Sequence, residues 1–211
     1  MPPCHSLQAD PERVDGPLSS DVGRRMEGAQ PSILSWGPIL SCSSMPARDE
    51  KMDRSQLLKK IDRAWEELNE SYVGLSDSEL LESYVTGNWS VRDIIAHVTW
   101  WEEEALKHLP LILAGGKPPK YSVAYGGIDA FNAQMTEQKR NLPLDEVLRQ
   151  RDETHHRLIE FIKTVPEDQI ARETRFRRRL RLDTYGHYPK HAEAIRKWRK
   201  QDASALSEFS Q

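Results

Sequence analysis

The sequence predicts an all-α protein built as a four-helix bundle. After residue 52, apolar residues recur every three to four positions, which is the period of an amphipathic helix. Helix-capping residues precede these segments, and glycine or proline clusters follow them. No stretch alternates apolar and polar residues convincingly enough to predict a strand. A bundle of this kind builds its sites from side chains that project inward from facing helices.

Residues 1–51 have the composition of a disordered tail. The first fifty residues hold seven of the thirteen prolines and eight serines, without sustained periodicity. The start MPPCHSLQAD lacks the basic stretch and apolar core of a secretory signal. We therefore expect residues 52–203 to form the folded domain. We also expect the tail to be an overlong translation start, with the working protein beginning near Met52.

Helix caps mark the first two helices of the bundle. Asp53 is placed to cap the first helix, with Gln56 three residues later, and LSDSEL at residues 75–80 marks its end. Its apolar stripe comprises Leu57, Leu58, Ile61, Trp65, Leu68 and Tyr72. Ser90 is placed to cap the second helix, with Asp93 three residues later, and AGGKPP ends it at residues 114–119. Its inward face comprises Ile94, His97 or Val98, Trp101, Ala105 and His108.

The last two helices follow a long connection. The third is expected after Pro143, and its stripe comprises Leu144, Val147, Leu148, Leu158, Ile162 and Val165. The fourth carries HAEAIRKW, residues 191–198. Between these two helices lies RETRFRRRLRL, residues 172–182, whose six arginines predict a solvated loop.

Composition excludes several classes of protein. The chain has 211 residues and a net charge of −3, which gives no general attraction for nucleic acid or membranes. No segment approaches the roughly 18 apolar residues of a spanning helix. Both cysteines, Cys4 and Cys42, lie in the predicted tail, so the folded domain has no cysteine nucleophile or cysteine-ligated zinc. We expect a soluble protein of the reducing cytoplasm.

Three histidines are candidate metal ligands. TYGHYPKH, residues 184–191, sets His187 and His191 four apart, so both imidazoles lie on one helix face and can reach one ion. His97 shares the inward face of the second helix, and three imidazoles with open coordination positions are typical of a catalytic metal site. The alternative is a hydrogen-bonded core histidine beside solvated histidines at a helix end. Pro189 fits only if it lies in the first turn of the fourth helix.

Other polar residues have simpler interpretations. His155 continues the stripe of the third helix as a core or pocket residue, with a fourth-ligand role as the less favoured alternative. His108, near the end of the second helix, suits the helix dipole as a partly positive imidazole. Glu102, Glu103 and Glu104 are expected to form a solvated face.

Two regions of the sequence resemble a known family. GNWSVRDIIAHVTWWEEE resembles the second-helix signature of the DinB-like superfamily. IDAFNAQMTEQKRNLPLDEVL, followed by TYGHYPKH, resembles its ClbS/DfsB branch, and the resemblance covers roughly residues 52–200. It implies a four-helix bundle with a long excursion between helices two and three, a homodimer, and a divalent zinc, nickel or iron ion held by His97, His187 and His191. Asn132, in FNAQ, matches the branch motif and is a candidate to hydrogen-bond a ligand.

The leading functional hypothesis combines the histidines with this resemblance. A metal held by three imidazoles can lower the pKa of bound water or of a bound thiol. The superfamily implies thiol-dependent S-transferases, which use a low-molecular-weight thiol, and detoxifying hydrolases. The branch includes a self-resistance protein that opens the cyclopropane of a genotoxin. We therefore expect a metal-dependent detoxification enzyme acting on a small electrophile.

Two rival hypotheses come from other classes. One is a binding protein that sequesters a small molecule or metal without turnover. The other is a nucleic-acid-binding module that uses the arginines of residues 172–182, and it is the least favoured because Phe176 is the one aromatic residue there. These arginines could instead meet the carboxylates of a small anionic substrate or thiol cofactor.

Overall fold

The computed structural model describes residues 51–208, with side chains as far as residue 201. Every regular element in this range is a helix, which confirms the all-α prediction. The helices are α1 (Arg54–Tyr72), α2 (Asp77–Leu81), α3 (Val91–Leu113), α4 (Tyr121–Ala124), α5 (Ile128–Lys139), α6 (Leu144–Thr164), α7 (Glu167–Ala171), α8 (Arg175–Asp183) and α9 (Tyr188–Glu208). None of them is long and apolar enough to cross a membrane. The predicted tail lies outside the described residues, except for its last residue, Lys51.

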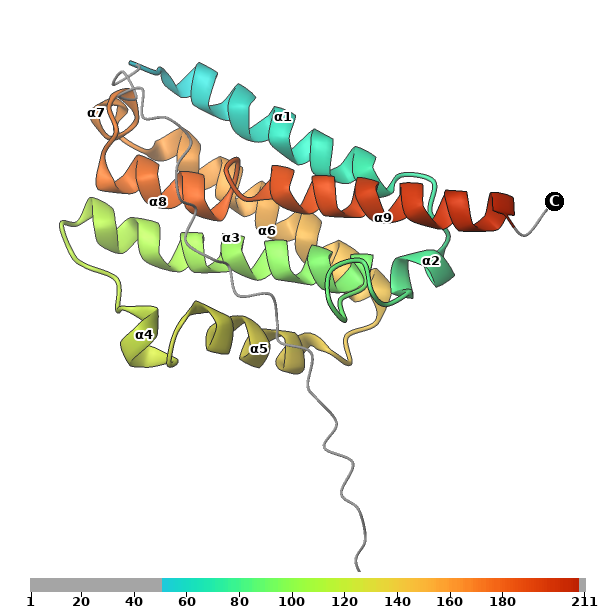
Figure 1. Ribbon diagram of the computed structural model, residues 1–211. Helices are drawn as coiled ribbons and strands as arrows, with labels where there is room; N and C mark the ends of the chain where they lie inside the picture. The colour runs from blue at the N-terminus through green and yellow to red at the C-terminus, as the bar shows by residue number, and fades with distance from the viewer. Residues whose placement is uncertain (1–50, 209–211) are drawn as a thin grey trace, which may run out of the picture. The chain divides into compact units, whose positions relative to one another are not determined.

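Four long helices, α1, α3, α6 and α9, form the bundle (Figure 1). α1 packs along α9, and α3 packs against α6 and α8. The apolar stripes predicted from the sequence face inward, and their central residues are almost completely buried. The largest fully buried side chains are Trp100, Tyr188, Phe131, Phe176, Leu57, Ile61, Leu68, Ile94, Ile95, Leu109, Leu158 and Ile162.

Capping boxes start the first two long helices, as the sequence predicts. The carboxylate of Asp53 accepts from the backbone N–H of Gln56, whose side chain accepts from the N–H of Asp53, at 2.8 and 2.9 Å. Ser90 and Asp93 make the same reciprocal pair at the start of α3. These bonds satisfy N–H groups that have no partner inside a helix, so they fix where the helix begins.

The long connection between α3 and α6 contains α4 and α5, and α5 runs beside α3 (Figure 1). Two contacts attach the connection to α3. The buried guanidinium of Arg92 donates to the carbonyl oxygens of Lys139 and Leu142 at 2.6 and 2.5 Å. Phe131 of α5 is 2% exposed and packs its ring against Trp101. The connection therefore forms a second layer over the face of α3 that carries Trp101.

The prediction of a solvated loop at residues 172–182 was wrong. Most of this stretch is helix α8, which begins at Thr174, where the hydroxyl accepts from the N–H of Arg177. Phe176 and Leu180, four residues apart, are fully buried against the bundle. Arg177 is also buried, whereas Arg172, Arg175, Arg178 and Arg181 are exposed. Burial of the Phe176 and Leu180 stripe favours the helix, and the exposed arginines project from its outer face.

A sharp break at residues 184–187 separates α8 from α9. The N–H of Gly186 donates to the carbonyl oxygen of Arg181 at 2.9 Å. A Cβ atom on Gly186 would lie 2.8 Å from that oxygen, so the close approach requires glycine. The break lets α9 restart at Tyr188, with His187 immediately before it and Pro189 in its first turn, where proline is tolerated.

Candidate metal centre

The structure brings His97, His187 and His191 together inside the bundle. Nε2 of His187 lies 3.1 Å from Nε2 of His97 and 2.9 Å from Nε2 of His191. One nitrogen of each ring lies within 4.8 Å of the other two. Within residues 51–208, these three form the one such group of histidine and carboxylate side chains. Sequence spacing therefore identified side chains that the fold places in contact.

Two segments position the three rings. His97 lies two turns into α3, beside the buried residues Ile94 and Trp101, so its ring points into the bundle. His187 and His191 come from the start of α9, where the residue before the helix and the fourth residue of the helix share a face. Pro189, between them, does not bend α9, because its missing N–H would have no partner in the first turn.

Burial keeps all three imidazoles neutral. His97 and His191 are each 3% exposed, and His187 is half-buried. Burial holds the pKa of His97 well below its ordinary value, and repulsion from a proton bound to His191 or His187 would lower it further. Burial does the same to the pKa of His187, with further lowering from a protonated His191 and from the charge of Lys190. Burial and Lys190 lower the pKa of His191 to about 4. At neutral pH each ring therefore has a free lone pair.

The donor set fits a divalent ion. Nitrogen ligands at 2.0–2.1 Å around a tetrahedral centre lie about 3.3 Å apart, close to the two separations of 3.1 and 2.9 Å. Neutral imidazole suits zinc, nickel and iron alike. Without an ion, Nε2 of His187 could make a hydrogen bond with only one of its two ring-nitrogen neighbours, because an imidazole nitrogen carries either one N–H or one lone pair. A metal role for these three residues stays a prediction, supported by this geometry.

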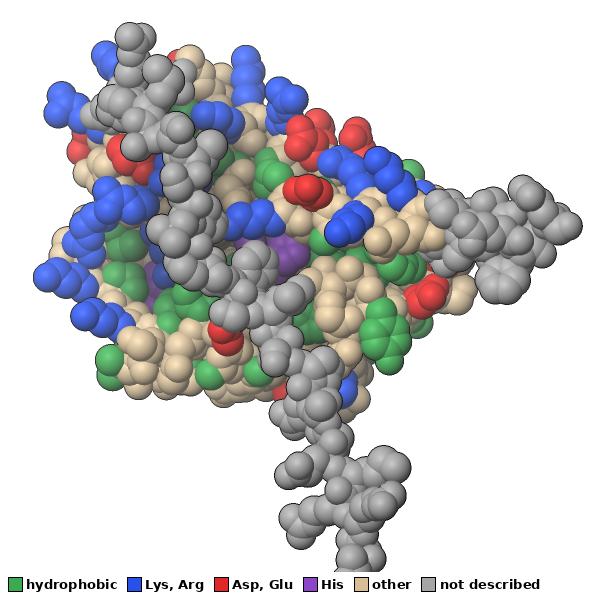
Figure 2. All heavy atoms as spheres, in the orientation of Figure 1, with side chains coloured by type: hydrophobic (Ala, Val, Ile, Leu, Met, Phe, Trp, Pro, Cys, Tyr) green, Lys and Arg blue, Asp and Glu red, His purple; other side chains and the backbone are tan. Residues whose placement is uncertain are grey.

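Three tryptophans surround His97. The ring centroids of Trp89 and Trp100 lie 4.7 and 4.9 Å from that of His97, and Trp101 lies 6.3 Å away. Trp101 also lies 6.2 Å from His187. Histidine side chains are visible from outside where α3 meets the start of α9 (Figure 2). Of the three candidate ligands, His187 is the least buried residue, although its Nδ1 is buried. The centre therefore has an apolar aromatic wall and lies nearest to solvent at His187.

Glu102 and Glu104 are not part of a solvated face, and the sequence-based interpretation was wrong for both. Glu102 is fully buried and Glu104 is 8% exposed. Glu103 is half-buried and pairs with Lys139 at 3.3 Å. The error arose because three consecutive acidic residues were treated as one surface, although consecutive positions on a helix point in different directions.

Glu104 belongs to a polar cluster at the far end of α3. Its carboxylate accepts from the Tyr121 hydroxyl at 2.5 Å and from Lys107 at 3.0 Å, and it lies 3.0 Å from Nε2 of His108. Burial raises the pKa of Glu104, but the hydrogen bonds from Tyr121 and Lys107 outweigh burial, so the pKa lies below its ordinary value. Burial lowers the pKa of His108, which contradicts the expectation of a partly positive imidazole.

Arg179 extends this cluster toward α8. Its guanidinium donates to Asp183 at 2.5 Å and to the Tyr121 hydroxyl at 3.1 Å, and it lies 5.9 Å from the ring centroid of Trp101. Burial raises the pKa of Asp183 to about 7, and the positive charge of Arg179 only partly offsets that effect. Arg179 is therefore held by groups within the fold and is not an exposed surface cation.

His155 and Asn132 lie in different surroundings. His155 of α6 stacks on Trp65 with ring centroids 3.8 Å apart, and its Nδ1 lies 2.8 Å from Glu102 Oε1. It is thus the core or pocket residue expected, and it is outside the histidine group described above. Asn132 lies on α5, and its buried Oδ1 has no hydrogen-bond partner among the described residues. Its ligand-binding role stays a prediction.

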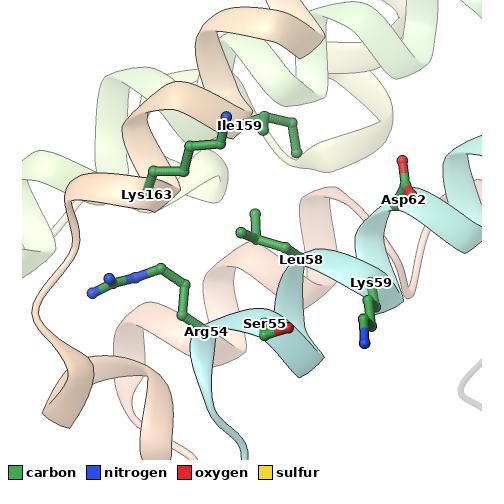
Figure 3. Close-up of a pocket in the computed structure, with 7 residues that line it drawn as sticks. All are labelled: Arg54, Ser55, Leu58, Lys59, Asp62, Ile159 and Lys163. Atoms are coloured by element: carbon green, nitrogen blue, oxygen red, sulfur yellow. The ribbon is translucent and has the colours of Figure 1, made fainter.

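A surface depression of about 540 Å³ lies between α1 and α6 (Figure 3), and none of the three histidines lines it. It is lined by Arg54, Ser55, Leu58, Lys59, Asp62, Ile159 and Lys163. A second, of about 390 Å³, shares Asp62, Ile159 and Lys163 with it and also reaches His155. Neither contains a converging set of polar groups comparable to the three imidazoles, so the histidine group is the stronger candidate for a functional site.

Comparisons with known proteins agree with this fold. The family model of the DinB superfamily matches residues 60–193. No curated protein matches the sequence. Solved structures of this fold include three with TM-scores of about 0.6. One is the colibactin self-resistance protein ClbS in complex with a dsDNA, with 15% identity and a TM-score of 0.61 over 70% of this chain and 96% of the ClbS chain.

The other two structures have similar scores. DfsB, described as a sibling lethal factor precursor, has 20% identity and a TM-score of 0.60 over 72% of this chain and 98% of its own. An uncharacterised protein from Escherichia coli UTI89 has 16% identity and a TM-score of 0.59 over 72% of this chain and 95% of its own. At these identities the likeness establishes the fold alone.

Proposed function

The chain belongs to the DinB superfamily, as its motifs predict, and from that premise we propose that it is a metal-dependent detoxification enzyme acting on a small electrophile. His97, His187 and His191 would hold one divalent ion, zinc, nickel or iron. The convergence of their three Nε2 atoms is the observation that carries the proposal. The reaction would be hydrolysis or transfer to a low-molecular-weight thiol.

The residues around the site have separate roles in this proposal. A divalent ion bound by three imidazoles keeps free positions and lowers the pKa of a bound water or thiol. His97 and His191, both buried, supply neutral nitrogens from two different helices. Trp101 closes the apolar side and excludes water, while His187, the least buried of the three histidines, marks the side from which a small molecule would enter. Asn132 is the candidate to hydrogen-bond that molecule.

Metal analysis and turnover together test this proposal. Untagged protein should carry close to one divalent ion per chain, and it should consume electrophile, with or without added thiol, beyond its own molar concentration. Consumption that stops at one equivalent would favour the rival function, a protein that sequesters a small molecule. Absence of bound metal, even after incubation with zinc, nickel or iron salts, would overturn the metal-dependent enzyme.

A second candidate function is nucleic-acid binding. ClbS was solved in complex with a dsDNA, which does not fit our sequence-based expectation that nucleic-acid binding is the least favoured function. Lysine and arginine side chains gather over α8 and the adjacent end of α3 (Figure 2). Exposed basic residues in this region are Lys117, Lys120, Arg172, Arg175, Arg178 and Arg181. They form a surface that could contact phosphates.

Salt-dependent binding of duplex DNA tests this second function. The triple change Arg175→Ser, Arg178→Ser and Arg181→Ser removes exposed charges and leaves the buried Arg177 and the internally held Arg179 in place. A nucleic-acid-binding protein would lose affinity and show a shallower salt dependence after this change. Wild-type protein that does not bind DNA at low salt would exclude the function.

Two further features of the proposal come from the family resemblance and the composition. We expect a homodimer, which light scattering on purified protein would detect as twice the chain mass. We also expect a cytoplasmic location, which fractionation of cells expressing the protein would test.

A further inference from the structure

A buried carboxyl group connects three helices next to the histidines. Glu102 of α3 is fully buried, and its Oε1 accepts a hydrogen bond from the hydroxyl of Tyr188 in α9. The same oxygen lies 2.8 Å from Nδ1 of His155 in α6. Tyr188 is also fully buried, and its ring packs edge-on against Trp65 of α1. Three long helices, α3, α6 and α9, therefore meet at this carboxyl group, and Trp65 of α1 packs against both of its partners.

Tyr188 connects this carboxyl group to two of the candidate metal ligands. Tyr188 is the first residue of α9, directly after His187 and three residues before His191, so it belongs to the same helical turn as the two histidines. Glu102 lies on α3, the helix that carries His97. The bond between the Tyr188 hydroxyl and Glu102 thus fixes the start of α9 relative to the helix of the third histidine.

Stability alone does not account for this carboxyl group. Burial raises the pKa of Glu102 despite its bonds to His155 and Tyr188. Its Oε2 is buried and has no hydrogen-bond partner among the described residues. An apolar side chain of similar volume would fill such a position at lower free-energy cost. Buried polar groups retained under these conditions can instead select one arrangement of the surrounding elements.

We propose that Glu102 and Tyr188 are positioning residues for the three histidines, holding the first turn of α9 at the distance from α3 at which the imidazoles share one ion. This inference rests on the proposed metal site. It assigns no contact with the metal or substrate to either residue. Since outer-shell groups around a metal ligand typically contribute 10- to 100-fold in metal affinity, loss of the bond should weaken metal binding by about 10-fold or more.

Cobalt(II) titration of the metal-free full-length protein tests the inference, because the visible absorption bands of Co²⁺ report ligand geometry. Tyr188→Phe removes only the hydroxyl, and Glu102→Met keeps the side-chain length but removes the acceptor. Both variants should bind Co²⁺ at least about 10-fold more weakly and with altered bands. Glu102→Gln retains an acceptor oxygen and should restore affinity and spectrum.

Two further variants separate positioning from stability. Glu104→Met removes another buried carboxyl of α3 whose partners, Tyr121, Lys107 and His108, lie outside α9, so it should lower the melting temperature without changing the cobalt spectrum. The double variant Glu102→Met with Tyr188→Phe also removes the Tyr188 hydroxyl that Glu102→Met leaves unpaired, so stability should recover in part relative to Glu102→Met, with Nδ1 of His155 still lacking its partner. Cobalt affinity should remain low in the double variant, because the link between the helices is still absent.

Each outcome has a distinct meaning. Wild-type cobalt affinity and bands in both Tyr188→Phe and the double variant would overturn the positioning role and leave the metal site intact. A cobalt spectrum that changes equally in Glu104→Met would also overturn it, because any loss of a buried carboxyl would then have the same effect. Wild-type protein that takes up no cobalt would overturn the proposed metal site, and this inference with it.

Discussion

Neutral imidazoles are the common requirement of the three candidate ligands, and burial provides it. Each of His97, His187 and His191 has a pKa below its ordinary value, chiefly because the bundle removes water from the charged form. Metal binding requires the same neutral form. The fold therefore keeps the three imidazoles in the form that binds an ion. As a consequence, the folded protein loses stability at low pH.

The pH dependence of stability has a definite sign for His191. Its pKa falls from 6.5 to about 4 on folding, so between these values the unfolded chain binds more protons than the folded chain. The free energy of unfolding should therefore decrease as pH falls from about 6.5 toward 4. Asp183 acts in the opposite direction, since burial raises its pKa to about 7. The difference between wild-type protein and His191→Asn isolates the histidine.

Urea unfolding of metal-free protein at a series of pH values measures this difference. As pH falls from about 6.5 toward 4, the free energy of unfolding of the wild type relative to His191→Asn should decrease steadily. Above pH 6.5 the difference should be constant. A difference that does not change with pH would show that His191 is not neutral in the folded state. Bound metal should be released only as pH approaches about 4, where the imidazole of folded His191 begins to bind a proton.

Replacement of the histidines one at a time tests their shared role. His97→Ala and His191→Ala should each remove most of the bound metal, because two remaining imidazoles hold an ion weakly. His187→Ala should do the same, since Nε2 of His187 lies within 3.1 Å of Nε2 of both His97 and His191. His156→Ala, which changes an exposed histidine, should retain full metal content. Elemental analysis of purified protein would decide, and full occupancy in His97→Ala and His191→Ala would contradict a shared ion.

Sequence spacing predicted which histidines meet, because four-residue spacing and an inward-facing position are local properties of helices. It missed Glu102, although a signal was present. Val98, Glu102, Ala105 and Leu109 follow the helical period, and all four are buried. Glu102 was interpreted as exposed because its side chain is charged. Its hydrogen-bond partners, His155 and Tyr188, lie on helices that are distant in the sequence. Such partners cannot be found from a local pattern.

Helix α8 has a larger role in stability than its six-arginine sequence suggests. Phe176 is fully buried and packs near Phe161 of α6, with ring centroids 6.4 Å apart. Phe176→Ala should therefore lower the free energy of unfolding by about 3–5 kcal/mol. Arg178→Ala, on the exposed face of the same helix, should change it by no more than about 0.5 kcal/mol. Urea unfolding would measure both, and equal small effects would show that α8 does not belong to the core.

Helices with strong caps and long stripes were predictable, and short ones were not. The starts of α1, α3 and α6 follow from Asp53, Ser90 and Pro143, whose local chemistry suffices to begin a helix. In helix α8, Thr174 is the one capping residue and two residues form the apolar stripe, so most of its sequence is arginine. Its helical state depends on burial against α3, a tertiary contact that the pattern does not contain.

Across the bundle, α3 is the element on which the site depends. It carries His97 and Glu102, packs against α6 and α8, and holds the connection of α4 and α5 through Arg92 and Phe131. The long helices of the bundle were predicted from the sequence, but the packing of the α4–α5 connection on α3 was not. Arg92 bonds to backbone carbonyls, which any sequence at positions 139 and 142 would supply.

Removal of residues 1–51 tests the boundary of the folded domain. Met52 must be kept, because its side chain is 4% exposed and its N–H donates to the carbonyl of Ala171 at 3.3 Å. The core residues in the described part of the chain, and the three histidines, lie at or after residue 52. A chain that starts at Met52 should therefore keep the melting temperature and metal content of the full chain. A decrease of more than about 4 °C, which corresponds to roughly 1 kcal/mol for a domain of this size, would show that the tail packs on the bundle. A second chain, released by a protease so that it begins at Asp53 without a preceding methionine, provides the matched comparison. It lacks the buried methionine and should melt at a lower temperature, so the pair locates the start of the folded domain to one residue.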